Sequence, residues 1–451
     1  MTETPGHSRT AAALAVCLAA ALTACTGAPA ATPPSGDEAV VATQDVLEAT
    51  ASGPITPEEA LALGEHLTAA LASGDVEAWL ERTDLDESAE QQQRDWFAGV
   101  QAVPMDLREM HPTFLVRVDD GAGGALVRYA FRHQVTGFDA VPVIELYDLT
   151  LTPSASGWRV AAVSGGDSDD AGYPRLWDLG PIVVHESRHS IVIDPGHGVD
   201  DSLLRGINEA VEAAQTEMPV EGSSRLLIEL SDPDAMQALT RRNTGGGPPT
   251  ALSYFPLASP EVERTGIMPD VEDGETGAPR IVVDARSLVE DARTAAGFAG
   301  GLPMVRERAI STAAYQRHFN VGSFTWVDVG LGWWFASAGD DAARQDVEAT
   351  YAAHLAEGGE PLFPPAGYWE FYADSAPQSL YTVQAVTIFR YVEHVHGRDV
   401  VFPLAEELLR VVPGTRAAET ALDKAFERHL GMSAAEVEAD WAEWVREEFD
   451  L

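Results

Sequence analysis

The first clear pattern of apolar and polar positions begins at Thr56 and predicts a helix. The segment Thr56–Glu59 has a capping threonine, a proline suited to the first helical position and a glutamate that completes a capping box. The apolar positions that follow share one helix face: Leu63, Leu67, Ala70 and Leu71. We expect Gly74 to end this helix and Asp75 to begin a second one, which carries Trp79.

Four strand-like runs follow these helices. They are rich in β-branched and aromatic residues: Thr113–Val118, Leu126–His133, Val143–Leu151 and Trp158–Val163. Helices followed by four antiparallel strands are typical of an α+β domain, which we place at residues 54–165. Its phrases, including Gln91-Gln92-Gln93 and a closing Gly157-Trp158-Arg159-Val160, resemble the small cone-shaped fold of the nuclear-transport-factor-like superfamily. Since members include enzymes, binding proteins and assembly modules, the resemblance implies no particular reaction, and we interpret His111 and His133 as surface or core residues.

The second half begins, after an acidic linker over 166–173, with strands and continues with helices. Strands are predicted at Arg225–Leu230 and Arg280–Asp284, with a helix at Pro233–Arg242 between them. The later helices are predicted from their apolar spacing: Asp341–Ala356, Ser379–His396, Phe402–Leu409, Ala417–His429 and a last helix capped by Ser433 and Glu436. The fold class is therefore α+β, with a second, mixed strand-then-helical domain over 174–451.

One pair of helices in this second domain resembles a known family. The segment Met304–Ala336 predicts a long helix, a short turn and a second, aromatic-rich helix. The first of these has its apolar face at Val305, Ala309, Thr312, Ala313 and Phe319. The pair is similar to the metal-binding helices of gluzincin-type zinc metallopeptidases, in which a His-Glu-x-x-His helix precedes a Trp-Leu-x-Glu-Gly segment. Trp326–Gly332 resembles that second segment.

The zinc ligands of that family are missing from this pair. Val329 stands where the resemblance places a glutamate ligand. Ser311–Tyr315 lies roughly where His-Glu-x-x-His belongs, and His318 is the only histidine within Met304–Ala336. Because a protein zinc site needs at least three ligands of its own, the resemblance implies a peptidase-like domain that has lost its metal. We therefore predict a non-catalytic binding or scaffold module, with no catalytic, cofactor-binding or metal-ligating residue.

Aromatic residues gather around the same region, and two interpretations of them remain open. They are Trp326, Trp333, Trp334, Tyr368, Trp369, Phe371 and Tyr372. They either fill a core left by the lost metal or line a groove for a peptide or sugar.

A zinc metallopeptidase site elsewhere is the alternative. His185-Glu186-Ser187-Arg188-His189 is literally His-Glu-x-x-His, and Glu209 follows at a spacing close to that of a third gluzincin ligand. The site would then use His185, His189 and Glu209 as ligands and Glu186 as general base. The flanking Ile-Val-Val and Ile-Val-Ile runs, bounded by prolines, favour a strand instead, on which two histidines four residues apart cannot share one ion.

Two further motifs have weaker alternatives. Ile191–Gly198 resembles the zinc-ligand segment of bacterial N-acetylmuramoyl-L-alanine amidases, which cleave peptidoglycan, but the next histidine after His197 is the distant His318. The Asp194-Pro195-Gly196 phrase is also ordinary turn chemistry. Gly245-Gly246-Gly247 lacks the lysine of a phosphate-binding loop and is interpreted as a flexible loop.

The N-terminus predicts export and a lipid anchor. Residues 1–25 combine a short apolar run, Ala11–Ala21, with Leu22-Thr23-Ala24-Cys25, which resembles a bacterial lipobox. That resemblance implies cleavage before Cys25, lipid on its thiol, and attachment to the outer face of the cytoplasmic membrane. The alternative is an ordinary secretory signal with an incidental cysteine. The other cysteine, Cys17, lies inside the removed segment, and residues 26–53 predict a flexible tether.

Composition then limits the partners. The formal net charge of −42 argues against binding to nucleic acid, whose phosphates require lysine and arginine. It also argues against electrostatic docking on anionic lipid, so we expect membrane contact through Cys25 alone. The remaining partner is predicted to be an unknown protein, peptide or cell-wall ligand.

Overall fold

The computed structural model describes most of the chain after residue 54. The described residues are 55–117, 124–155, 157–165, 174–219, 225–232, 234–236, 251–254, 256, 258, 277–289, 300–318, 324–373, 377–411 and 416–449. All of them belong to one of the two units into which the chain divides, Thr50–Leu451. The predicted signal peptide with Cys25, the tether over 26–53, the linker over 166–173 and the triple-glycine loop lie outside the described residues.

The first helix forms as its sequence predicts. In α3, Pro57–Ser73, the Thr56 side chain accepts from the Glu59 backbone N–H, and the Glu59 side chain accepts from the Thr56 N–H, which completes the capping box. Gly74 ends the helix in the left-handed region, at φ 69°. The residue before the cap, Ile55, is fully buried. Two shorter helices follow, α4 at Val76–Leu80 and α5 at Glu87–Ala102.

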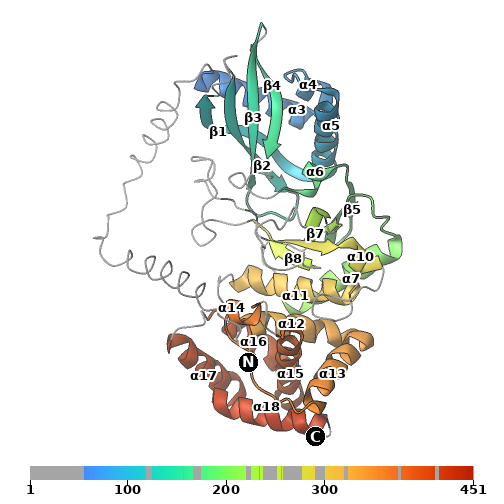
Figure 1. Cartoon of the computed structure of the whole chain (residues 1–451), viewed down its shortest axis with the longest axis vertical. Helices are drawn as coiled ribbons and strands as arrows, with labels where there is room; N and C mark the ends of the chain where they lie inside the picture. The colour runs from blue at the N-terminus through green and yellow to red at the C-terminus, as the bar shows by residue number, and fades with distance from the viewer. Residues whose placement is uncertain are drawn as a thin grey trace, which may run out of the picture. The chain divides into compact units, whose positions relative to one another are not determined.

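A four-stranded antiparallel sheet, here called sheet A, comes next. Its strands pair in chain order: β1 Met105–Arg117, β2 Ala125–Val135, β3 Val143–Ser154 and β4 Gly157–Gly165. Figure 1 shows these strands beside α3, α4 and α5. One face packs on α3, where the buried Tyr129 hydroxyl donates to the Ala60 carbonyl oxygen at 2.8 Å. The prediction of helices followed by an antiparallel sheet is confirmed.

A second sheet, sheet B, has mixed strand directions. Its order is β5 Val183–Glu186, β6 Ser190–Asp194, β7 Leu226–Ser231, β9 Arg280–Asp284 and β8 Ala251–Tyr254. The strands β6, β7 and β9 are parallel, and the helix α7, Asp201–Glu217, connects β6 to β7. Parallel neighbours require such a crossover connection, and the apolar stripe through Ile207 and Val211 buries α7.

The two faces of sheet B belong to different cores. Ile191, Leu227 and Val282 pack with the core of sheet A and its helices. Their neighbours in sequence, Ile228 and Ile281, face the other way, into the core that holds α7 and the C-terminal helices. Side chains alternate along a strand, so the same three strands contribute to both cores. The residues that we predicted as two domains therefore share a hydrophobic core across sheet B.

The C-terminal part is helical. After the short α6, Leu176–Leu179, and α10, Ala285–Val289, its helices are α11 Leu302–His318, α12 Thr325–Ala338, α13 Asp341–Ala356, α14 Tyr368–Phe371, α15 Gln378–His396, α16 Arg398–Leu408, α17 Arg416–Leu430 and α18 Ala434–Glu448. The long predicted helices form with bounds close to those expected. The exception is α16, which begins at Arg398 and not at the predicted Phe402, so that Val400 and the buried Val401 also belong to the helix.

Glycines let α12 pack closely between two neighbours. A Cβ added at Gly330 would lie 2.8 Å from the Ala385 backbone oxygen of α15. A Cβ added at Gly332 would lie 2.8 Å from the Ser311 Oγ of α11. Both separations are shorter than normal contacts, so the absence of a side chain at these positions sets how near the helices approach.

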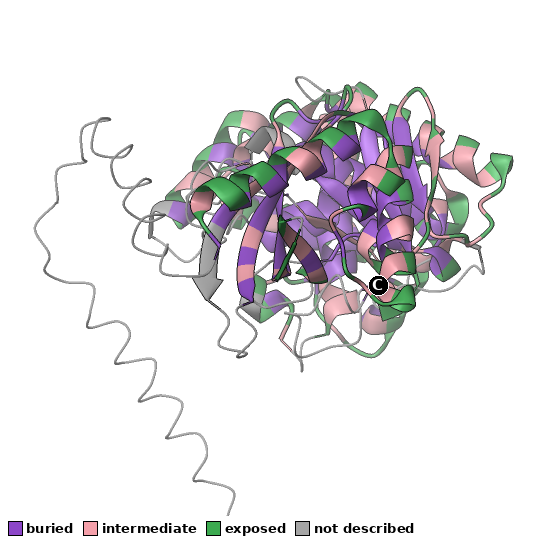
Figure 2. Ribbon diagram, turned by 90° about the horizontal axis from the view of Figure 1, so that it is seen from above, coloured by how far each residue is buried: buried purple, intermediate pink, exposed green. Residues whose placement is uncertain are grey.

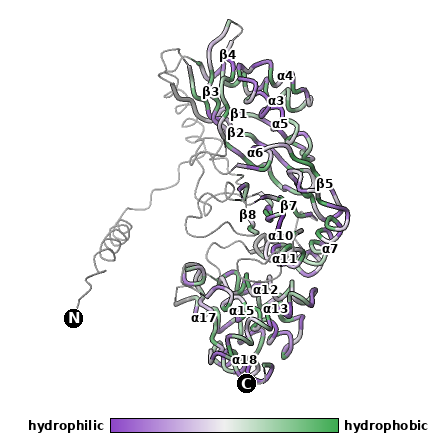
Figure 3. Tube along the Cα trace, turned by 45° about the vertical axis from the view of Figure 1, so that its right-hand side comes forward, coloured by the Kyte–Doolittle hydropathy of each residue, from purple (hydrophilic) through white to green (hydrophobic). Residues whose placement is uncertain are grey.

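The distribution of burial agrees with this packing. In Figure 2 the buried residues gather along the inner faces of helices and strands, and the exposed ones lie at outer faces and turns. Figure 3 shows hydrophobic and hydrophilic residues alternating along the same elements. Among the described residues, no helix is long and apolar enough to cross a membrane.

Candidate functional site

The His-Glu-x-x-His motif lies in a β-hairpin. Our prediction of strand structure in residues 182–193 is confirmed. The prediction of one continuous strand is wrong, because the chain turns back at Ser187–His189 between β5 and β6. The turn is fixed by Asn208 of α7, whose Oδ1 accepts from the Ser187 Oγ at 2.7 Å and from the His189 backbone N–H at 2.9 Å. Polar residues with local hydrogen-bonding partners favour a turn over continued pairing.

The residues of the alternative zinc site do not converge. Glu186 accepts from Arg225 Nη1 at 3.2 Å, and His185 lies opposite Val192 in the hairpin. His189 faces α7, and its Nε2 lies 3.6 Å from Glu212 Oε1. The α7 residue beside His189 is therefore Glu212 and not the proposed ligand Glu209.

Glu209 itself is exposed, as its position off the apolar stripe predicts. Within the part of the chain that the structure describes, no three His, Cys, Asp or Glu side chains are placed to hold one metal ion. The sequence spacing that suggests Glu209 as a third zinc ligand is therefore not matched by the positions of the side chains.

The segment similar to the amidases forms a turn after β6. Asp194 Oδ1 accepts from the backbone N–H groups of Gly196 at 2.9 Å and His197 at 2.7 Å. Gly196 has φ 102° and Gly198 has φ 76°, conformations that favour glycine. Asp194 is thus engaged by its own loop, as turn chemistry predicts.

The helix pair that resembles the gluzincin site has other side chains at its centre. Val329 is 6% exposed and packs in the core. Ser311 Oγ lies 3.5 Å from the Asp328 carbonyl oxygen, and Thr312 Oγ1 lies 2.8 Å from Ser253 Oγ. The buried Glu307 pairs with its neighbour in sequence, Arg308. The side chains of Tyr315 and Phe319 lie outside the described residues.

The aromatic residues of this region divide into two groups. Trp326, Trp334 and Phe371 are almost completely buried, so the interpretation as core residues is confirmed for them. Trp333 is also buried, and the side chain of Trp369 lies outside the described residues. The exposed residues are Tyr368 and Tyr372, at 51% and 40%, with ring centroids 4.8 Å apart.

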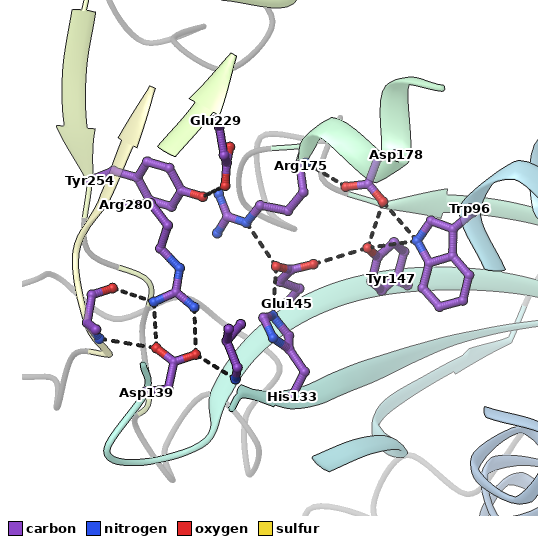
Figure 4. Close-up of polar contacts among 12 residues, drawn as sticks. Trp96, His133, Asp139, Glu145, Tyr147, Arg175, Asp178, Glu229, Tyr254 and Arg280 are labelled. Atoms are coloured by element: carbon purple, nitrogen blue, oxygen red, sulfur yellow. Dashed lines mark hydrogen bonds and ion pairs between the residues drawn. The ribbon is translucent and has the colours of Figure 1, made fainter. Parts of the chain in front are cut away.

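A buried cluster of polar side chains lies where sheet A meets sheet B, and we call it the sheet A–B cluster. Its labelled members in Figure 4 are Trp96, His133, Asp139, Glu145, Tyr147, Arg175, Asp178, Glu229, Tyr254 and Arg280. At its centre Glu145 Oε1 lies 2.9 Å from both His133 Nε2 and Arg175 Nε. Burial alone would raise the pKa of Glu145, but His133 and Arg175 outweigh it and lower that pKa to about 2.

The Tyr147 hydroxyl joins Glu145 to a second carboxylate in this cluster. Its oxygen lies 2.7 Å from Asp178 Oδ1 and 3.2 Å from Glu145 Oε2. Trp96 Nε1 donates to the same Asp178 oxygen at 3.0 Å. Burial, followed by the charge of Glu145, raises the pKa of Asp178 to about 7.

Sheet B contributes the other side of the cluster. Tyr254 donates to Glu229 Oε1 at 2.6 Å, and the Arg175 guanidinium lies 4.5 Å from the centroid of the Tyr254 ring. Burial raises the pKa of Glu229, although Arg175 acts in the opposite direction. Arg280 donates to Asp139 twice, at 2.7 and 2.8 Å. These contacts tie the strands of sheet A to those of sheet B.

Of the side chains in this cluster, only His133 is weighed as a candidate from the sequence. A signal was available for His133, which alternates along β2 with partly exposed residues, at a position where the strand pattern calls for an apolar side chain. A polar residue at such a position predicts a buried partner. The partner of His133 is Glu145 on the neighbouring strand β3, and Arg175, which also bonds Glu145, could not be assigned from spacing.

Comparisons with known proteins add little to this geometry. No protein-family model matches the chain, and no curated protein matches it. One solved structure, a protein of unknown function from Mycobacterium tuberculosis, is similar at 18% sequence identity and a TM-score of 0.18. That similarity covers 23% of this chain and 66% of that protein. It carries no argument about fold or function.

Proposed function

We propose that this protein is a lipid-anchored extracytoplasmic binding or scaffold module. Residues 174–451 would be a relative of gluzincin metallopeptidases without zinc ligands, and residues 54–165 a relative of the nuclear-transport-factor-like superfamily. Lipid on Cys25 would hold the protein at the outer face of the cytoplasmic membrane. Its ligand would be a protein, a peptide or a component of the cell wall.

The observation that carries this proposal is the contact between α11 and α12. Catalysis by a gluzincin requires imidazole and carboxylate ligands to face one ion from these two helices. Here the facing groups are Ser311, Glu307 and the bare backbone of Gly332, which lie so close that a Cβ at Gly332 would come within 2.9 Å of both side chains. Glu307 is a single carboxylate already paired with Arg308, and a hydroxyl group and a glycine add no nitrogen donor, so these groups fall short of the three protein ligands that zinc needs.

The sheet A–B cluster supports the same conclusion from another direction. A carboxylate that serves as a catalytic base must be free to take a proton from a substrate. Glu145 is 6% exposed and is already held by His133 and Arg175, so the chain's own side chains occupy its hydrogen-bonding capacity. We therefore infer that the cluster stabilises the contact between sheet A and sheet B and does not serve as a catalytic base.

Metal analysis tests the proposal most directly. The protein is purified without chelators, and zinc per chain is measured by mass spectrometry for wild type and for the double variant His185→Ala/His189→Ala. We expect far less than one zinc per chain in both proteins. One tightly bound zinc per wild-type chain would refute the proposal. Loss of that zinc in the double variant would assign it to the hairpin.

A second measurement asks for the ligand. The purified chain, immobilised through its C-terminus, is exposed to envelope extract and to soluble cell-wall fragments, and retained material is identified. A matched sample unfolded beforehand controls for adsorption. Turnover of a peptide or cell-wall substrate that Glu186→Gln abolishes would favour the zinc hydrolase instead.

A further inference from the structure

The Tyr147 hydroxyl lies between two carboxylates but carries one proton. Its oxygen is within hydrogen-bond distance of Asp178 Oδ1, at 2.7 Å, and of Glu145 Oε2, at 3.2 Å. A single O–H can donate to only one of them at a time. With both acids ionised, one carboxylate oxygen therefore faces the Tyr147 oxygen without a proton between them, which is a repulsive contact in a buried site.

One added proton removes this conflict. When Asp178 carries it, the Asp178 O–H donates to the Tyr147 oxygen, and the Tyr147 O–H donates to Glu145. His133 and Arg175 bond the other oxygen of Glu145, Oε1, so this carboxylate stays ionised and fully bonded. The remaining oxygen of Asp178, Oδ2, accepts from the Arg175 backbone N–H at 2.6 Å.

The surroundings decide which acid takes the proton. The charged and titratable groups that act directly on Asp178 are Glu145 and Tyr147 of β3 and Arg175. His133 of β2 acts on Glu145, and Glu229, Tyr254 and Arg280 of sheet B lie beyond Arg175. Glu145 has the Arg175 guanidinium and the His133 imidazole within hydrogen-bond distance, whereas the corresponding side-chain neighbours of Asp178 are the neutral Tyr147 and Trp96. The proton therefore resides on Asp178.

We propose that the Asp178–Tyr147–Glu145 chain is a proton-operated clasp that holds α6 against α5 and sheet A more tightly in mild acid. The segment is well placed for this role. α6 ends at the exposed Leu179, shortly before the first strand of sheet B, so its attachment fixes the point at which the chain passes from one sheet to the other. Asp178 is partly exposed, so its carboxyl group can exchange protons with solvent.

The direction of the effect follows from linkage. The pKa of Asp178 is raised from its ordinary value near 3.8 to about 7 in the closed state, because its surroundings disfavour the charge. Between these two values the closed state binds a proton that the open state does not hold. The equilibrium constant for opening therefore increases as pH rises from 4 to 7 and levels off above 7.

Hydrogen exchange measures that equilibrium. Exchange of peptides spanning 174–180 is followed by mass spectrometry from pH 5 to 8 and corrected for intrinsic exchange, in wild type, Asp178→Asn and the control Asp95→Asn. Asp95 lies next to Trp96 in α5, and among the described residues its side chain accepts a hydrogen bond from Gln91 alone, at 2.9 Å. In wild type and in Asp95→Asn we expect the opening constant to rise by up to about tenfold per pH unit between pH 5 and 7. In Asp178→Asn it should not change.

Infrared spectroscopy of the wild-type protein detects the protonated carboxyl group directly, without any variant. Infrared difference spectra of wild-type protein with carboxyl-labelled aspartate should show one protonated carboxyl band that disappears with a midpoint near pH 7. A pH-independent opening constant in wild type, an unchanged slope in Asp178→Asn, or the absence of such a band would each overturn the proposal. If Asp178→Asn does not fold, the infrared titration decides alone.

Discussion

The buried pair between Asp139 and Arg280 is the sharpest test of how sheet A and sheet B hold together. Asp139 lies between β2 and β3 and is completely buried, and Arg280 begins β9 with its side chain 4% exposed. Asp139 accepts twice from Arg280 and also from the backbone N–H groups of Val135, at 3.0 Å, and Ala278, at 3.3 Å. One carboxylate thus satisfies donors from both sheets.

Replacing Asp139 by alanine should cost a large free energy. Removing one partner of a buried pair leaves the other charge desolvated and unpaired, which costs about 3 to 5 kcal/mol of unfolding free energy. The two backbone N–H groups also lose their acceptor, so we expect Asp139→Ala to lower the free energy of unfolding by about 5 kcal/mol. Arg280→Met should lie lower in the same range, because the carboxylate keeps its backbone donors.

The double variant separates pairing from burial. Asp139→Ala/Arg280→Met leaves no unpaired charge, so its loss should be smaller than the sum of the single losses by about 2 to 3 kcal/mol. Urea unfolding followed by tryptophan fluorescence and far-UV circular dichroism measures each value, with coincident curves as the condition for comparison.

An exposed pair provides the control. Asp341 pairs with Arg344 at 2.7 Å, but its side chain is 81% exposed, so Asp341→Ala should change stability little. Additive losses at Asp139 and Arg280, or a loss at Asp139 no larger than that at Asp341, would refute the reasoning. Either result would mean that the pair does not couple the two sheets.

Three further predictions concern other parts of the chain. Gly330→Ala should destabilise the protein by about 1 to 3 kcal/mol, and by more than Gly332→Ala, because the first clashes with the backbone of α15 and the second with side chains that can move. Urea unfolding measures both losses of stability, and equal losses would contradict this reasoning. The stabilisation from Glu145, whose pKa is lowered to about 2, should be present above pH 4.5 and lost as pH falls toward 2, and acid titration of Glu145→Gln by circular dichroism should lack that component. Cys25→Ser should move the exported protein from the membrane pellet to the soluble fraction, and retention in the pellet would contradict lipid anchoring.

Local signals in the sequence predicted local structure well. The capping boxes at Thr56 and Ser433 both form, because the groups that define them lie within three residues of each other. The bounds of α13 also agree with its apolar pattern, and those of β9 match the predicted strand although its pairing partners, β7 and β8, are distant in sequence. A helix whose backbone groups satisfy one another nearby needs little information from the rest of the chain.

The hairpin between β5 and β6 and the sheet A–B cluster could not be predicted in this way. The apolar runs on both sides of Ser187 have the same strand pattern whether the chain continues or reverses, and the reversal depends on Asn208 in α7. Glu145 likewise has its partners on β2 and next to α6. Contacts between residues far apart in the chain depend on topology, which hydrophobic periodicity does not encode.

The start of the described fold at Ile55 has a mechanical consequence. Ile55 is fully buried directly before the capped first turn of α3, so tension applied from the N-terminal side reaches the core within a single residue. Such a load would first extract the Ile55 side chain and then uncap α3, while sheet B and the C-terminal helices stay unloaded. In a force-spectroscopy experiment with handles at residue 54 and Gly74, we expect α3 to detach as the first event.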